Sequence, residues 1–304
     1  MNRLSWWDVP ESFAVEVRRR LRSRVVEAAT QPGGFSPGVA ALCLLEDGRS
    51  VFIKACGTGI NPMTPKLHRH EAAVLDRLRD VPFVPALLDV VDNGDWIALL
   101  IEGVHGRLPT ARDSSAVTRV LSLLTRVQSL PPGLLPPMGD PSFAQLQISP
   151  WADLAADGVA LDPWSVEHLD ELLTLEQQAG ALEGTVVCHG DFRLDNVLFT
   201  ADGHTSLADW AHAKAGPDFA DLVEVCIDIH VEGGPAPAVT FAAHAPTALH
   251  TSDGVTAYLA AVTGRLTRQG TFAEPPGMTD FRAFQQRQAA SAQSWLARRM
   301  AAGI

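Results

Sequence analysis

The chain has 304 residues, 46% hydrophobic and 19% charged, so it is long enough for two lobes with a sizeable core and too apolar to be mainly disordered. Its formal net charge of −11 excludes a sequence-independent grip on nucleic-acid phosphates or on an anionic membrane surface. The charge is uneven: residues 1–150 carry 16 Lys and Arg against 15 Asp and Glu, and residues 151–304 carry 8 against 20.

Segments that would direct the chain out of the cell are not predicted. The first residues lack the apolar core of a signal peptide, and no apolar run approaches the roughly 18 residues of a membrane span, so we expect a cytoplasmic protein. The four cysteines are far apart without a Cys-x-x-Cys pair, which predicts buried free thiols instead of a zinc site or a disulfide framework. The pattern does not determine the oligomeric state.

The first hundred residues mix strands with two helices. Apolar residues at a spacing of four (Phe13, Val17, Leu21, Val25) predict a leading helix, and Asp47-Gly48 between two apolar runs predicts a hairpin turn. Helices are expected over 11–29 and 67–78, and strands over 39–45, 51–55, 86–91 and 96–101. This part is predicted to be a small, mostly antiparallel sheet with one inserted helix.

After Gly103 the pattern becomes helical. Helices are expected over 112–130, 143–157, 164–180, 218–230, 253–268 and 278–302. Among them, residues 185–209 alternate short apolar runs with charged residues, which indicates strands joined by polar loops. The sequence therefore predicts an α+β protein with a sheet lobe followed by a helical lobe.

The strongest chemical signal is His189-Gly190-Asp191-Phe192-Arg193-Leu194-Asp195-Asn196, followed thirteen residues later by Asp209-Trp210. An Asp and an Asn five apart on one loop can face one cleft, the first to accept a proton and the second to offer an oxygen to a cation. A further Asp at the next strand end can complete a metal site. These are the parts of phosphoryl transfer. The alternative, a polar hairpin whose Asp and Asn only make turns, explains each residue singly but not the spaced set.

The segment HGDFRLDN, followed by Asp-Trp, Gly-Pro and Asp-Leu, resembles the aminoglycoside phosphotransferase and choline kinase family of small-molecule kinases. The resemblance implies a bilobal protein-kinase-like fold, with an N-terminal nucleotide-binding lobe over 1–103 and a helical lobe over 104–304 that holds the catalytic loop, the metal site and the acceptor site. It also implies that Asp191 is the catalytic base, that Asn196 and Asp209 bind Mg²⁺, and that Asp221 braces the catalytic loop through backbone N–H groups.

The first lobe contains two residues that fit this resemblance. Val51-Phe52-Ile53-Lys54-Ala55 is similar to the strand whose lysine grips the α- and β-phosphates, and Glu71 stands in the next helix, where the carboxylate partner of that lysine belongs. A strand-end lysine in solvent and a surface glutamate are the alternatives for each residue taken alone. Their order relative to Asp191 favours the pair.

Two further segments are weaker matches. Residues 31–38 stand where a phosphate-covering loop is expected, with Gly34 and Ser36 as candidate contacts, but they contain no G-x-G-x-x-G, and Pro37 lacks an N–H. A plain helix-terminating turn is the alternative. Residues 99–108 resemble the inter-lobe hinge, where the Glu102 carbonyl and the Val104 amide would pair with the adenine edge.

The predicted function is an ATP-dependent phosphotransferase, with GTP possible as donor and Mg²⁺ as cofactor. The acceptor is a hydroxyl of a small molecule, and the acidic second half favours a cationic one: an aminoglycoside or other antibiotic, an amino sugar or an amino alcohol. The same acidity also serves plain solubility. Antibiotic resistance, self-protection and metabolism all stay open as roles.

Other classes are less consistent with the motifs. A nucleotide-binding pseudokinase with a regulatory or scaffold role is the main alternative, but Lys54, Asp191, Asn196 and Asp209 are all present. Protein-kinase activity is disfavoured because the triplet is His-Gly-Asp and no Ala-Pro-Glu follows. No Walker A sequence occurs, which excludes a P-loop ATPase.

Overall fold

The computed structural model describes residues 3–31, 37–135, 150–275 and 278–304. The chain forms two compact units, each built from separate stretches. Unit 1 comprises Met1–Pro109, Asp195–Ala213 and Glu274–Asp280, and unit 2 comprises Thr110–Leu194, Lys214–Ala273 and Phe281–Ile304, in each case where the residues are described.

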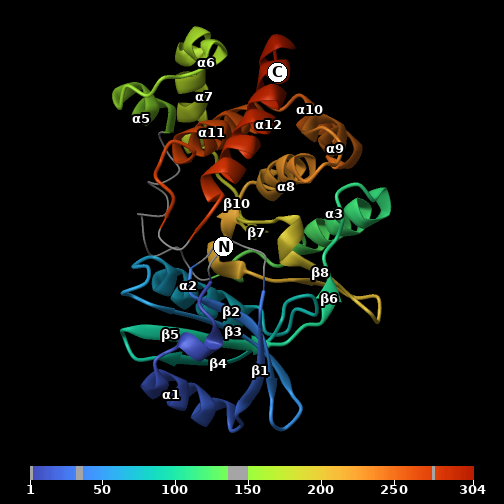
Figure 1. Ribbon diagram of the computed structural model, residues 1–304. Coiled ribbons are helices and arrows are strands. Elements are labelled where there is room, and N and C mark those ends of the chain that lie inside the picture. The colour runs from blue at the N-terminus through green and yellow to red at the C-terminus, as the bar shows by residue number, and fades with distance from the viewer. Residues whose placement is uncertain (1–2, 32–36, 136–149, 276–277) are drawn as a thin grey trace. The chain divides into compact units, whose positions relative to one another are not determined.

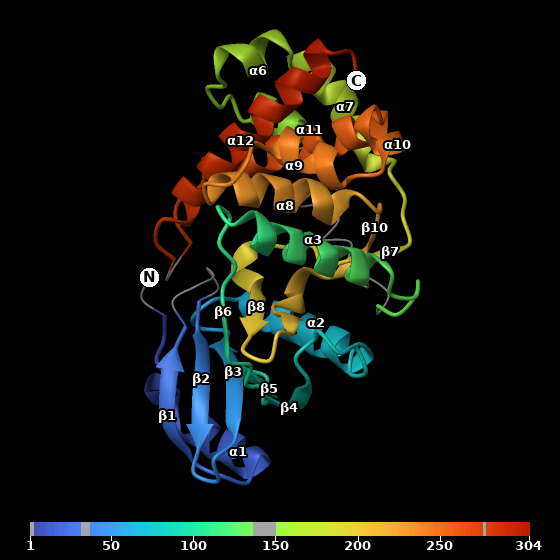
Figure 2. The same ribbon diagram turned by 90° about the vertical axis from the view of Figure 1, so that its right-hand side faces the viewer.

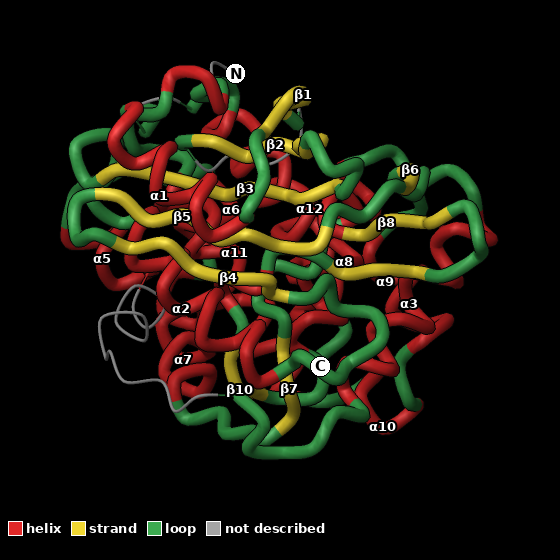
Figure 3. Tube along the Cα trace, turned by 90° about the horizontal axis from the view of Figure 1, so that it is seen from below, coloured by secondary structure: helices red, strands yellow, loops and turns green. Residues whose placement is uncertain are grey.

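Unit 1 is built on a five-stranded antiparallel sheet in the order β1-β2-β3-β5-β4 (Figures 1 and 3). Its strands are β1 (Val25–Thr30), β2 (Val39–Leu45), β3 (Ser50–Gly57), β4 (Leu87–Asp92) and β5 (Trp96–Glu102). The turn between β2 and β3 contains Gly48 at a φ of 84°, a left-handed conformation that glycine adopts without a steric penalty.

The two faces of this sheet have different roles. Alternate residues of β3, including Val51, Ile53 and Ala55, point to a core that α1 (Glu11–Leu21) covers with Phe13 and Val17. The residues between them on β3, including Lys54, point to the opposite face, against which α2 (Thr64–Arg77) packs. The strand period of two therefore separates a structural face from a face that lines a cavity.

The second part of unit 1 is a small three-stranded sheet in the order β6-β8-β9. It consists of β6 (Gly106–Arg107), β8 (Val197–Thr200) and β9 (Thr205–Leu207), and short 3₁₀ turns at Leu194–Asn196 and Trp210–His212 adjoin it in the chain. The turn at Trp210–His212 packs on α2.

Unit 2 is mainly helical (Figures 1 and 2). Its described helices are α3 (Ser114–Gln128), α5 (Pro150–Ala156), α6 (Pro163–Glu167), α7 (Leu169–Gly180), α8 (Ala220–Val231), α9 (Pro237–His244), α10 (Thr247–His250), α11 (Asp253–Gln269) and α12 (Phe281–Ala301). A two-stranded antiparallel sheet pairs β7 (Val186–Cys188) with β10 (Lys214–Gly216). In Figure 2, helices α3, α8 and α9 lie in successive layers, in agreement with the packing of α8 on both α3 and α9.

Most predicted elements are present. The helix predicted over 164–180 is divided at His168 into α6 and α7, and the largest error concerns the leading helix. The helix predicted over 11–29 ends at Leu21, where Arg22 takes the left-handed conformation (φ 55°), and Val25–Thr30 form edge strand β1 paired with β2. The apolar spacing of four includes Val25, but pairing with β2 places Val25–Thr30 in a strand, because tertiary contacts override the local helical pattern. Residues 143–149 of another predicted helix lie outside the described residues. The α+β class, with a small antiparallel sheet and a larger helical part, is confirmed.

Two smaller predictions can also be compared with the structure. All four cysteines are buried free thiols, as expected. Over the part of the chain that the structure describes, no helix is both long and apolar enough to cross a membrane.

Candidate active site

A cavity of about 310 Å³ lies on the α2 side of the five-stranded sheet, and all the described residues that line it belong to unit 1. Apolar side chains of β2, β3 and β5 form part of its wall, among them Leu42, Phe52 and Ile101. Its polar lining includes Lys54, Glu71, Asn196 and Asp209. The cavity therefore combines an apolar slot with a charged end.

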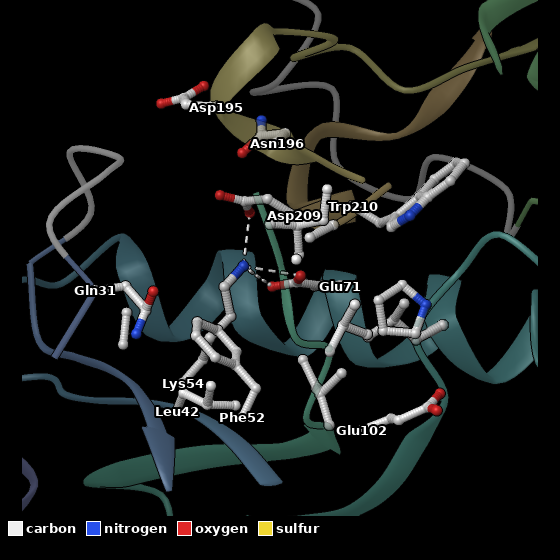
Figure 4. Close-up of a pocket in the computed structure, with 18 of the residues that line it drawn as sticks. Gln31, Leu42, Phe52, Lys54, Glu71, Glu102, Asp195, Asn196, Asp209 and Trp210 are labelled. Atoms are coloured by element: carbon white, nitrogen blue, oxygen red, sulfur yellow. Dashed lines mark hydrogen bonds and ion pairs between the residues drawn. The ribbon is translucent and has the colours of Figure 1, made fainter. Parts of the chain in front are cut away.

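Lys54 is the centre of the charged end (Figure 4). Its ammonium Nζ lies 2.8 Å from both carboxylate oxygens of Glu71 and 2.7 Å from Oδ1 of Asp209. Glu71 is only 1% exposed and Lys54 8%, so water screens this contact weakly. Burial acts to lower the pKa of Lys54, but the carboxylates of Asp209 and Glu71 outweigh it and raise the pKa above its usual value. The lysine is therefore a fixed positive charge.

The backbone places Asn196 and Asp209 at the same end. Asn196 precedes β8 and Asp209 follows β9, and the Ala208 N–H donates to the Asn196 carbonyl over 2.9 Å. Asp209 has a φ of 66°, a left-handed conformation that Asp tolerates better than most residues and that is often retained at functional sites. Figure 4 shows Asn196 beside Asp209.

These two side chains fit a magnesium site of a particular kind. Among the described residues, no group of three or more His, Cys, Asp or Glu is placed to hold a metal ion by itself. Mg²⁺, however, is commonly held by one or two protein oxygens together with substrate phosphates and waters. One carboxylate and one amide oxygen match that donor set.

The predicted adenine contacts lie at the other end of the lining. Glu102, Val104 and Gly106 line the cavity. The segment is tied to the sheet, because the Glu102 N–H donates to the Ala86 carbonyl over 2.8 Å and the Gly103 N–H donates to the Ser50 carbonyl over 3.2 Å. The pairing of the Glu102 carbonyl and the Val104 N–H with adenine stays a prediction.

The predicted phosphate loop is only partly described. Gly34 and Ser36 lie outside the described residues. Gly38, at the end of the loop, has a φ of 102°, and a Cβ there would lie 2.4 Å from the Ala55 carbonyl oxygen. The backbone at Gly38 thus approaches β3 more closely than any other residue type would allow.

In unit 2, two buried carboxylates of α8 hold the loop that carries Asp191. Asp221 accepts hydrogen bonds from the N–H groups of His189 (2.6 Å) and Gly190 (3.0 Å), which is the bracing that the family resemblance implies. Burial raises the pKa of Asp221 to about 6, although both N–H groups oppose the shift. Asp228, two turns further along α8, accepts the Leu194 N–H over 2.9 Å. The loop is thus fixed at both ends.

Asp191 itself is partly exposed, with 29% of its side chain accessible. The Nε of Arg193 lies 3.6 Å from its Oδ1, and the Arg193 guanidinium stacks over the Phe284 ring at 5.5 Å. Asp191 belongs to unit 2, whereas Lys54, Glu71, Asn196 and Asp209 are brought together in unit 1. The metal-ligand candidates therefore group with the N-terminal sheet, although the predicted lobe boundary placed them with the helices.

Sequence reasoning missed three residues with a clear place here. Asp228 is one of the carboxylates of the acidic second half, which favours a cationic acceptor, but its contact with the Leu194 N–H makes it a support of the loop. Arg3 and His68 both line the cavity, and nothing in their sequence context pointed to it.

Lys54, Glu71, Asn196 and Asp209, the residues for which the sequence predicts kinase roles in unit 1, thus line one cavity. Residues 60–255, more than half of the chain, match the phosphotransferase enzyme family, and the chain belongs to this family. The small-molecule kinase class predicted from the sequence is thereby confirmed. No curated protein sequence matches the chain significantly.

Solved structures share the fold at low identity. The choline kinase LicA from Streptococcus pneumoniae is 16% identical with a TM-score of 0.68, covering 95% of this chain and 99% of that one. An aminoglycoside phosphotransferase from Alicyclobacillus acidocaldarius is 17% identical with a TM-score of 0.57, covering 91% and 92%. A thermostable mutant of aminoglycoside phosphotransferase APH(4)-Ia, in a ternary complex with AMP-PNP and hygromycin B, is 14% identical with a TM-score of 0.60, covering 93% and 99%. These similarities support the protein-kinase-like fold that the motif predicted.

Proposed function

We propose that the chain transfers the γ-phosphoryl group of ATP, with Mg²⁺, to a hydroxyl group of a small molecule. The observation that carries this proposal is the contact of Lys54 with both Glu71 and Asp209 in a cavity that also has an apolar slot. An apolar wall suits a purine base, and an ammonium with adjacent carboxylate and amide oxygens suits a metal-bound polyphosphate. The nucleotide complex of the APH(4)-Ia mutant is consistent with this donor.

Each residue has a distinct part in the proposed reaction. Lys54, oriented by Glu71, contacts the donor phosphates as a point charge. Asn196 and Asp209 bind Mg²⁺, which neutralises charge on the phosphates when bound. Asp191 orients the acceptor hydroxyl and accepts its proton as the new P–O bond forms, while the bond between the γ-phosphorus and the β–γ bridging oxygen breaks and ADP leaves. The loop need not reorganise during the reaction, because Asp221 and Asp228 hold its backbone.

We further propose a cationic acceptor, on the support of the net acidity of residues 151–304. The structure reduces the number of carboxylates that could bind a cationic acceptor, because some of them have structural partners. Asp157 pairs with Arg268 at 3.5 Å, Asp162 caps α6, and Asp228 holds the loop. Glu167 and Glu232 are exposed.

One contact favours a second candidate, an acceptor that carries an anionic group. The side chain next to Asp191 within unit 2 is the cation Arg193, itself only 13% exposed. Arg287 stacks over the same Phe284 ring as Arg193 does, at 5.6 Å. Arginine guanidinium groups bind carboxylates and phosphates through two parallel hydrogen bonds, so the surface formed by Arg193 and Arg287 suits an acid or a phosphate ester.

An acceptor panel tests the function and separates the two acceptor classes. ATP consumption is measured with aminoglycosides, other antibiotics, amino sugars, choline-like amines and homoserine, together with neutral sugars and hydroxy acids of similar size. Turnover that is confined to amines supports the cationic class, and turnover that is confined to acids supports the anionic one. No acceptor-dependent turnover, together with intact nucleotide binding, would favour the pseudokinase alternative, which the family membership does not support.

A further inference from the structure

The stretch that precedes α1 folds back against the five-stranded sheet of unit 1. Trp6 and Val9 are buried in the core that α1 and the sheet share. The Leu4 N–H donates to the Gly38 carbonyl over 3.2 Å, at the end of the predicted phosphate loop. Ser5 and Asp8 close a capping box on the short turn between them. The backbone around Arg3 is therefore anchored beside the cavity.

Arg3 extends from this anchored stretch into the cavity wall. The Arg3 guanidinium interacts electrostatically with the carboxylates of Asp209 and Asp195, both of which line the same cavity. Burial lowers the pKa of Arg3 and outweighs the opposing effect of the two carboxylates, but an arginine stays charged at neutral pH. The guanidinium is thus a partly desolvated cation close to a predicted magnesium ligand.

In the part of this cavity wall that the structure describes, two buried polar atoms have no hydrogen-bond partner. Among the described residues, neither Nε of Arg3 nor Nδ1 of His68 has a hydrogen-bond partner, and both atoms are shielded from solvent. A buried polar group without a partner is costly and calls for an explanation such as a ligand. His68 lines the same cavity, with Nδ1 3.9 Å from a Glu71 oxygen, and burial lowers its pKa to about 3, which keeps it neutral. Arg3 is therefore the charged donor of the two.

The charges of the cavity show why a second cation is needed. Lys54 is the ammonium at the charged end, and it is shared between Glu71 and Asp209, with Asp195 adding a further negative charge. A triphosphate brings about four negative charges, of which one Mg²⁺ compensates two. The phosphate loop is also poor in donors, because Pro32 and Pro37 have no backbone N–H.

We propose that Arg3 is a second cationic contact for the phosphate groups of the donor nucleotide, acting together with Lys54. This inference rests on the proposed function, since it assumes that the cavity binds ATP. Arg3 supplies from a side chain the hydrogen bonds that a glycine-rich loop would supply from its backbone. The guanidinium leaves the neighbourhood of Asp195 and Asp209 for the stronger negative charge of the phosphates.

The test compares Arg3→Gln with a matched control in which the same substitution is made at Arg19, an exposed position on α1. Calorimetry measures the affinities of AMP-PNP with Mg²⁺, ADP, AMP and adenosine, and thermal unfolding checks that each variant is folded. We expect Arg3→Gln to weaken AMP-PNP about 10- to 100-fold, as is typical of a lost charge-assisted contact, and adenosine less than about twofold. Arg3→Lys should recover part of the loss, and Arg19→Gln should match the wild type.

The outcomes separate this inference from the function on which it rests. Equal weakening of adenosine and AMP-PNP would show that Arg3 only supports the fold, and unchanged affinities would show that it lies outside the phosphate site. Both results overturn the inference and leave the proposed function standing, because the wild type still binds AMP-PNP. A wild type that binds no nucleotide would overturn both.

Discussion

Replacing Lys54 by Met tests the charged end of the cavity most directly. The substitution keeps a long unbranched side chain but removes the ammonium that lies 2.8 Å from both oxygens of Glu71. Asp209, with 27% of its side chain exposed, can recover hydration, whereas Glu71 at 1% cannot. The energetic cost should therefore arise mainly from a buried glutamate without a counter-ion.

The expected loss follows from that burial. Removing one partner of a buried ion pair costs about 3–5 kcal/mol of unfolding free energy. The loss should depend on pH. Without Lys54 the folded-state pKa of Glu71 rises further above its unfolded value of about 4.3, so the penalty is present at high pH and fades as pH falls through the raised pKa. The deficit of the variant should be larger at pH 8 than at pH 5.

Urea denaturation of the wild type, Lys54→Met, and Lys54→Met combined with Glu71→Gln measures this effect. The double variant removes both charges and should return to within about 1–2 kcal/mol of the wild type. In parallel, Lys54→Met should weaken ATP much more than adenosine. A single variant as stable as the wild type at pH 8, or a double variant no more stable than the single one, would contradict the reasoning.

Three other predictions concern single residues of the site. Asp191→Asn should lower turnover by roughly 10²–10⁴ while nucleotide affinity stays nearly unchanged, and steady-state kinetics showing full activity would remove Asp191 from the role of base. Asp209→Ala should abolish the Mg²⁺-dependent part of nucleotide binding, and calorimetry with and without the metal checks this; an unchanged affinity would count against the metal site. Burial lowers the pKa of His68 to about 3 in the folded chain, whereas in the unfolded chain its pKa is about 6.5. Below about pH 6.5 the unfolded chain therefore binds a proton that the folded chain does not bind, and the free energy of unfolding falls as pH decreases. His68→Asn should remove about 2 kcal/mol of that loss at pH 5, measured as the difference in pH dependence of unfolding, and parallel profiles for the two proteins would refute it.

Much of the site could be predicted because the chemistry is concentrated in a few short segments. Asp191, Asn196 and Asp209 lie within nineteen residues of sequence, and their order is informative without any tertiary contact. Lys54 was recognisable because Val51-Phe52-Ile53-Lys54-Ala55 resembles the lysine-bearing strand of the kinase family, and the structure shows that the strand period of two places Lys54 opposite to the apolar core residues of that strand. Its pairing with Glu71 was implied by the same resemblance and favoured by the order of both residues relative to Asp191.

Other parts could not be predicted because they depend on contacts between distant segments. The period of four in residues 13–25 is compatible with one long helix, and only pairing with β2 makes Val25–Thr30 a strand. Nothing in the sequence distinguishes Asp228 from a surface carboxylate. In the structure it lies two turns after Asp221 on α8 and accepts the Leu194 N–H, which makes it the second support of the loop. Arg3 reaches the cavity because Trp6 and Val9 anchor the stretch that precedes α1 in the core of unit 1. No local motif encodes this anchoring.

Residue type, period and spacing were sufficient to predict the α+β class and the succession of sheet and helices, because these are local properties of the chain. The resemblance of one short motif to a kinase family then indicated which residues to consider for phosphoryl transfer. The tertiary structure alone decided which of those residues share a cavity, which carboxylates serve the backbone, and which additional cation stands beside Asp209. The physical reason is that hydrogen bonds and ion pairs such as Lys54 with Asp209, 155 positions apart, exist only after long-range packing has excluded water.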